Sequence, residues 1–325
     1  MKDRFGLSAF PCRAKMEGET PMNSHANPHY MSFRKTFDSA QGMAVWGDEA
    51  YVLYHTGMCS VYSLISRDAE PICTFQLGSF NEGEPTTPYC NHANQAMFSG
   101  IHYEDNPIPL LYVTTGNDGG ADQDGFYYRC AVENITRSDD PSGEVTFTSE
   151  LLQTIIYNNQ GLEATSWESP CWGAPAFFVD TNNRSLYIFS ARYRTTKQYL
   201  PYWDRNAFII TKFPLPDVVL NSRVILTAAD IVDQFTTPFD ILFTQGGTLY
   251  EDKIYYTFGY GNEDYPLGLR VFDLTLRKVV ASLDLSRSEF ANEEIECCSF
   301  YHNKLLCNTN SGNIYSVQDG VFPMD

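Results

Sequence analysis

The sequence predicts an all-β fold, a single β-propeller, and three features of the chain indicate it. Short runs of four to nine residues, rich in Val, Ile, Tyr, Phe and Thr, are separated by Gly, Asn, Asp and Pro. Almost no segment repeats its apolar residues with the helical period of about 3.6 residues. The runs also return in sets of four, which is the arrangement of a propeller blade.

The composition fits one folded domain with a large core. The chain has 325 residues, of which 43% are hydrophobic and 14% aromatic. Its 21 Tyr and 22 Phe favour pleated strands over helices. With 40 acidic and 22 basic residues the net charge is −18, and no local basic patch offsets it. Nucleic acid is therefore not an expected partner, because the chain repels phosphate backbones.

The first set of strands lies in residues 41–77. Its four runs are QGMAVWG, AYVLYHT, CSVYSLI and ICTFQL, which predict a four-stranded antiparallel meander. Further sets follow at residues 93–156, 172–226, 245–284 and 294–317.

Two details of the third set complete its assignment. We assign its fourth strand to RVILT at residues 223–227. The one short helix that we expect, Ala228–Gln234, follows directly, with Thr227 as its N-cap.

The fifth set lacks a fourth strand, and the run YMSFRKTF at residues 30–37 is unassigned. If this run completes the last blade, the ring closes and no sheet edge is left unpaired. We therefore expect five blades in residues 30–325 and an extension at residues 1–29, with six blades as the alternative if residues 78–92 or 157–171 contain strands.

Polar and aromatic residues gather at one end of the expected ring. The first strand of each blade lines the central channel, and the loops at its start are long, so we expect function there. The candidate ligand-binding residues at the strand starts are Gln41, His92, Asn94, Trp172, Gln245 and Glu296. Loop aromatics on the same face are Tyr199, Tyr202, Trp203, Tyr260 and Tyr265. Aromatic rings beside amides and carboxylates suit a glycan or an extended peptide of a protein partner. The alternative is that these groups bond and pack only with one another.

Two further functions remain open. A glycoside hydrolase-like enzyme needs two carboxyl groups, about 5–5.5 Å apart for retention or about 6.5–9.5 Å for inversion. The weak catalytic candidates are Glu168, Asp240, Glu294 and Glu296. Gln41 opens the first blade where such an enzyme would carry a carboxylate, which disfavours this reading. The other function is a pure protein-interaction scaffold.

We expect no cofactor. Asp118, Asp122 and Asp124 lie in a Gly-rich acidic loop, which makes calcium a weak candidate there, but their spacing does not fit an EF-hand. His92 has no partner at a metal-ligand spacing. The nine cysteines include no CxxC pair, so we interpret them as buried free thiols, with one disulfide as the alternative.

The sequence leaves the compartment and the oligomeric state open. No run of about 18 apolar residues predicts a transmembrane helix. The N-terminal residues contain no apolar segment typical of a secretory signal. The chain is therefore cytoplasmic as it stands, or exported if a leader precedes it.

Several phrases together resemble a loose group of largely uncharacterised bacterial β-propeller proteins, many from gut Bacteroidetes. These phrases are NHANQAMFSG, PLLYVTTG, LTAADIVDQF, QGGTLYEDKIYYTFG, LRVFDL and EIECCSFYHNKLL, within residues 35–317. In that group His-Ala-Asn, Gln-Gly and Glu-x-Glu open separate blades. The resemblance implies a propeller, and export for many members. It maps the recurring positions onto His92, Asn94, Gln245, Gly246, Glu294 and Glu296.

Overall fold

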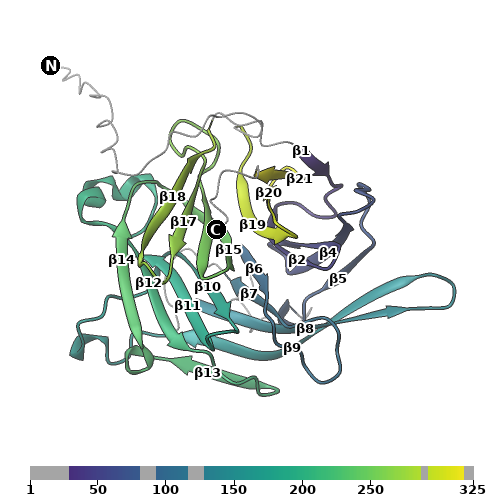
Figure 1. Ribbon diagram of the computed structural model, residues 1–325, viewed down its shortest axis with the longest axis horizontal. Coiled ribbons are helices and arrows are strands. Elements are labelled where there is room, and N and C mark those ends of the chain that lie inside the picture. Colours follow the sequence, from purple (N-terminus) through teal and green to yellow (C-terminus); the bar gives the residue numbers. More distant parts are fainter. Residues whose placement is uncertain (1–28, 81–92, 116–127, 287–291, 318–325) are drawn as a thin grey trace.

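The computed structural model describes residues 29–80, 93–115, 128–286 and 292–317. These residues form five separate sheets that surround a common axis (Figure 1). The protein is therefore a five-bladed β-propeller, as predicted. In the first four blades the innermost strand comes first in sequence, and the outer strands follow in chain order.

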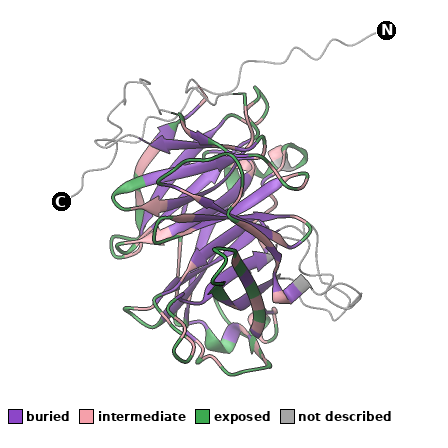
Figure 2. Ribbon diagram, turned by 90° about the vertical axis from the view of Figure 1, so that its right-hand side faces the viewer, coloured by how far each residue is buried: buried purple, intermediate pink, exposed green. Residues whose placement is uncertain are grey.

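The strands of the first blade are nearly continuous apolar runs in the sequence, and their burial explains this pattern. All five residues from Ala50 to Tyr54 are fully buried, because both faces of a blade pack against its neighbours. The blade consists of β2 (Ala40–Trp46), β3 (Glu49–Tyr54), β4 (Met58–Ser63) and β5 (Cys73–Gln76). Figure 2 shows the same contrast over the whole molecule, with buried strands and exposed connecting loops.

The second blade carries a long hairpin that projects from the ring (Figure 1). On this hairpin Phe147 stacks against Phe75 of the first blade, with ring centroids 5.8 Å apart. The one-turn helix η1 (Gly78–Phe80) connects the two blades. The strands are β6 (Gln95–Phe98), β7 (Leu111–Thr115), β8 (Tyr128–Asp139), β9 (Val145–Tyr157) and an added strand, β13 (Ser222–Leu226).

The added strand corrects our assignment of the third blade. The segment at residues 223–227 is not the fourth strand of that blade, because β13 pairs in parallel with β9 of the second blade. The Gln153 side chain on β9 fixes this crossing by donating to Ser222 Oγ at 2.9 Å. The fourth strand of the third blade is instead β14 (Asp233–Pro238), after β10 (Trp172–Asp180), β11 (Ser185–Ala191) and β12 (Ala207–Pro214).

The helix expected at Ala228–Gln234 is also wrong in length. It is a single 3-10 turn, η5 (Ala228–Asp230), because Gln234 already belongs to β14. The N-cap is correct: Thr227 precedes the turn, and its backbone N–H donates to Asp230 Oδ2 at 2.8 Å, as in a capping box. This capped turn returns the chain from β13 to the third blade. Other one-turn or short 3-10 helices are η3 (Leu162–Ala164) and η4 (Lys197–Arg205).

The fifth blade is closed by the beginning of the chain. Strand β1 (His29–Ser32) pairs antiparallel with β21 (Asn313–Val317), with Met31 opposite Ile314. The predicted closure is confirmed, although the strand covers four residues rather than residues 30–37. The other strands of the fourth and fifth blades are β15 (Thr244–Tyr250), β16 (Lys253–Phe258), β17 (Gly268–Asp273), β18 (Lys278–Asp284), β19 (Ile295–Tyr301) and β20 (Lys304–Thr309).

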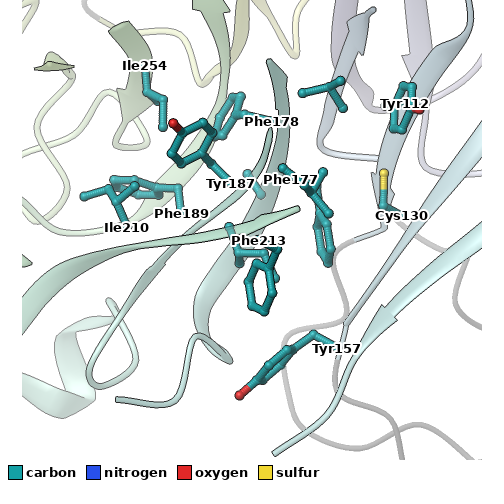
Figure 3. Close-up of a cluster of buried hydrophobic side chains, with 14 of the residues drawn as sticks. Tyr112, Cys130, Tyr157, Phe177, Phe178, Tyr187, Phe189, Ile210, Phe213 and Ile254 are labelled. Carbon is teal, nitrogen blue, oxygen red and sulfur yellow. The ribbon is translucent and has the colours of Figure 1, made fainter. Parts of the chain in front are cut away.

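The largest apolar cluster joins the second, third and fourth blades. Figure 3 shows its aromatic side chains, among them Tyr112 and Phe177, between the sheets. Phe189 stacks on Tyr256 of the next blade with ring centroids 4.2 Å apart. Burying each such ring stabilises the fold by about 1.5–3 kcal/mol. The blades are therefore held rigidly around the axis.

The axis itself is filled by backbone at one level. A Cβ atom on Gly246 of β15 would lie 2.4 Å from the Asn94 carbonyl oxygen and 2.9 Å from that of Glu296. Gly42 of β2 approaches as closely, and its N–H donates to the Ala93 carbonyl at 2.8 Å. Only glycine permits this approach. The polar residues at the strand starts therefore lie next to closely packed backbone of the innermost strands.

Candidate functional site

Two glutamates stand where β19 begins. Glu296 is the second residue of the strand and is 1% exposed, whereas Glu294 precedes the strand and is partly exposed. Residues two apart in an extended chain point to the same side. The sequence therefore places two carboxyl groups side by side at the axis.

Three amide side chains from other segments hold these carboxyl groups. Gln41 Nε2 donates to Glu296 Oε1 at 3.3 Å, and Gln245 Nε2 donates to Glu294 Oε1 at 3.1 Å. Asn310 Nδ2 lies 3.0 Å from Glu296 Oε1 and 3.5 Å from Glu294 Oε2, so it bridges the pair. We name these five residues the axial carboxyl cluster. Four of them were singled out from the sequence.

Burial governs the protonation of the two carboxyl groups. It raises the pKa of Glu296 well above the ordinary glutamate value, and the neighbouring Glu294 charge raises it further. Burial also raises the pKa of Glu294, although hydrogen bonds from Gln245 and Tyr260 oppose the shift. Within the described ranges no Lys, Arg or His forms an ion pair with either group. The pair therefore has no counter-charge in that part of the protein.

The cluster also contains a hydrogen-bond acceptor without a donor. Gln41 is 2% exposed, and no described residue donates to its Oε1. Two other side-chain oxygens are in the same situation, Asn94 Oδ1 just before β6 and Asn308 Oδ1 on β20, in residues that are 4% and 0% exposed. Asn308 contacts the cluster directly, because its Nδ2 donates to the Gln41 carbonyl at 2.7 Å. A buried polar atom left without a partner costs about 1–3 kcal/mol, so these oxygens favour a donor from outside.

Tyr260 connects the cluster to the surface. This residue is 38% exposed, and its side chain hydrogen-bonds Glu294. Its ring packs on Phe243 with centroids 4.2 Å apart. An exposed aromatic ring therefore stands beside the partly exposed carboxyl group.

The other predicted aromatic residues have mixed placements. Trp203 packs into the core against Phe239, with centroids 4.9 Å apart. Tyr202 is 43% exposed and packs on Tyr193. Trp172 begins β10 and lies under the Arg194 guanidinium. Tyr202 and Trp172 thus remain candidate ligand contacts, whereas Trp203 has a packing role.

Two of the four carboxylate candidates are neutralised elsewhere. Glu168 lies in the loop before β10 and accepts hydrogen bonds from Arg192, one of them at 2.6 Å. Asp240 lies between β14 and β15 and pairs with Arg270 at 2.8 Å. Neither residue is on an innermost strand. The predicted residues that lie outside the described residues are His92, Asp118, Asp122 and Asp124, together with the side chain of Tyr199.

Sequence reasoning missed three residues of the site. Asn310 lies in the turn between β20 and β21, Asn308 ends the buried face of β20, and Ser39 precedes β2. The Ser39 hydroxyl accepts from Gln41 Nε2 at 2.8 Å and from Asn310 Nδ2 at 3.2 Å. Nothing in the sequence distinguishes Asn310 from the other turn asparagines, because its role depends on ring closure.

The described part of the chain contains seven cysteines, which are all free, and all except Cys73 are buried. No group of three or more His, Cys, Asp or Glu side chains in this part of the chain is arranged to hold a metal ion. None of the helices described has the length and apolar character needed to cross a membrane.

Comparison with known proteins gives likeness of structure alone. No protein-family model matches the chain, and no curated protein matches it in sequence. Among solved structures, a glutaminyl cyclase from Myxococcus xanthus is similar over 91% of this chain and 92% of its own, with 12% identity and a TM-score of 0.44. The computationally designed protein Ika8 is similar over 89% of this chain and 98% of its own, with 8% identity and a TM-score of 0.35.

Proposed function

We propose that this protein is a ligand-binding propeller whose site is the axial carboxyl cluster, with Tyr260 at its entrance. The observation that carries the proposal is the buried, unpartnered Oε1 of Gln41 beside the partly exposed Glu294. A buried acceptor of this kind needs a donor, which an ordered water or a ligand can supply. A glycan is the first candidate class, because its hydroxyl groups donate to carboxyl and amide oxygens and its C–H faces stack on tyrosine.

Binding is better supported than glycoside hydrolysis. A catalytic carboxyl group must come within hydrogen-bond reach of its substrate, about 2.6–3.2 Å. Glu296 is 1% exposed and already accepts hydrogen bonds from two amides. Only Glu294 is open to a substrate, and hydrolysis requires two such groups. The carboxyl pair therefore supports a role in recognition.

The experiment combines a glycan array with a panel of chromogenic glycosides. Wild-type protein is compared with Glu294→Gln, Glu296→Gln and a control, Glu251→Gln, which removes a charge from the exposed turn at the far end of β15. We expect retention of one glycan group by the wild type and the control, loss of retention in Glu294→Gln, and no turnover. Turnover that Glu296→Gln abolishes would replace binding by hydrolysis. If neither the glycan array nor the glycoside panel gives a signal, the glycan proposal is overturned and a protein partner becomes the next candidate.

A further inference from the structure

We propose that the group which enters the axial carboxyl cluster is a protonated primary amine of the ligand. This inference rests on the proposed function, because it names the chemistry that the same site recognises. Two sources present that group to a surface site, an amino sugar and the amino terminus of a peptide.

The first step concerns charge. Glu294 and Glu296 share the Asn310 amide, and in the described residues neither has a cationic partner. By contrast, the carboxyl groups of Glu168 and Asp240 each pair with an arginine. Buried charges in proteins are normally paired. No cation in the described residues pairs with the partly exposed Glu294, and a cationic ligand would stabilise its ionised form.

The second step concerns hydrogen bonds. Around the site, the groups left for a ligand are acceptors: the Glu294 carboxyl group and the unpartnered Oε1 of Gln41. The donors of the cluster are already used, since the Gln41, Gln245 and Asn310 amide nitrogens all bond to glutamate oxygens. An ammonium group has three donors and no acceptor. It matches this set, because each of its N–H groups can donate to one of these oxygens.

The third step concerns the entrance. The Tyr260 hydroxyl bonds Glu294, and the Tyr260 ring packs on Phe243. Aromatic faces attract a cation by about 0.5–2 kcal/mol when it is partly desolvated. The net charge of −18 adds a long-range attraction for cations. Every element of the entrance therefore favours a positive group over a neutral or negative one.

The test is isothermal titration calorimetry on the full chain with three pairs of probes. They are glucosamine and N-acetylglucosamine, glycinamide and N-acetylglycinamide, and calcium chloride with sodium chloride as its ionic-strength control. We expect at least one free amine to bind about tenfold or more tightly than its acetylated form, because acetylation removes a charge-assisted hydrogen bond. The sugar and glycinamide pairs distinguish the two sources.

Two substitutions of Glu294, together with melting temperatures, separate a loss of amine binding from a loss of folding. Glu294→Gln is expected to weaken amine binding about tenfold or more, and Glu294→Asp to retain the preference for the free amine with lower affinity. Glu251→Gln should bind as the wild type does, and unchanged melting temperatures confirm that each variant is folded. If acetylated and free forms bind equally, or if only calcium binds, the amine inference is overturned while a retained glycan leaves the proposed function standing. If no probe binds and the glycan array is silent, both fail.

Discussion

Glu133 is a buried carboxyl group that joins the first two blades. It is fully buried, and its two oxygens accept from the Gly78 and Ser79 N–H groups at 3.0 and 2.9 Å and from the Ser149 hydroxyl at 2.8 Å. Burial raises its pKa, and these hydrogen bonds oppose the shift. The two N–H groups belong to η1, which connects the blades. This side chain therefore ties η1, which follows the first blade, to β8 and β9 of the second.

Replacement of Glu133 should destabilise the protein more than the loss of its charge explains. In Glu133→Gln an NH2 group must face a backbone N–H, which cannot accept a hydrogen bond. We expect the free energy of unfolding to fall by about 2–3 kcal/mol, measured by urea denaturation. Glu150→Gln, an exposed change on neighbouring β9, should alter it by less than about 0.5 kcal/mol. Equal effects of the two variants would show that the η1 contacts contribute nothing.

The two glutamates of the axial carboxyl cluster should make stability depend on pH. Both have pKa values above the ordinary glutamate value of about 4.3, chiefly through burial. A raised value in the folded state means that this contribution to stability is complete below about pH 4.3 and is lost as the pH rises through the raised values. Glu296→Gln removes the group with the larger shift and keeps an oxygen acceptor for Gln41 and Asn310.

We therefore expect the wild type to lose stability relative to Glu296→Gln as the pH rises above about 4.3, the ordinary glutamate value. Unfolding free energies at a series of pH values measure the difference. The exposed control Glu251→Gln should follow the wild-type curve. Parallel curves for all three proteins would contradict the role of burial.

Residues at the strand starts were predictable because the blade repeat fixes their position. Gln41, Gln245, Glu294 and Glu296 each stand where an apolar run begins, and the ring brings the four together. Glu133 was not predictable, since an acidic residue inside a strand looks the same whether it is solvated or buried. Its burial depends on η1 of the preceding blade, which local sequence does not encode.

At the scale of elements, propensity identified the strands but not always their partners. The run at residues 223–227 is rich in β-branched residues, and it does form a strand, β13. It pairs with β9 of another blade, because β9 offers an open outer edge and Gln153 bonds Ser222 there. The more polar β14, DQFTTP, pairs with β12 instead, in the position that we had assigned to residues 223–227. β-propensity therefore shows that a segment forms a strand, but it does not show which neighbouring strand the segment pairs with.

Substitution of Gly246 tests how closely the innermost strands must pack. In Gly246→Ala the new Cβ would meet the Asn94 and Glu296 carbonyl oxygens at 2.4 and 2.9 Å, and backbone cannot move away as a side chain would. We expect a loss of about 3 kcal/mol or more in unfolding free energy. Gly100→Ala is the matched control, since its Cβ would lie 3.5 Å from the nearest atom, a Thr181 methyl group. A similar small effect in both variants would show that the strands can separate without cost.

At the scale of the whole molecule, the two ends of the described chain share one blade. Besides β1 pairing with β21, the Phe33 N–H donates to the Gly312 carbonyl at 2.8 Å in the fifth blade. The Tyr62 hydroxyl of the first blade donates to the Arg34 carbonyl at 2.8 Å. The segment thus bonds to the blades on both sides of the closing point.

Met31 tests whether this closure stabilises the entire ring or only one strand. It is 3% exposed and belongs to an apolar cluster with Val52 of the first blade and Leu306 of the fifth. Met31→Ala should lower the unfolding free energy by about 2–5 kcal/mol, and the transition should remain single because all blades share the loss. Ser32→Ala, which removes an exposed hydrogen bond to Asn313 on β21, should cost less, about 0.5–1.5 kcal/mol. Hydrogen exchange distinguishes the outcomes: global coupling accelerates the buried amides of every blade. Acceleration confined to β1 and β21 would show that the ring is stable without its closing strand.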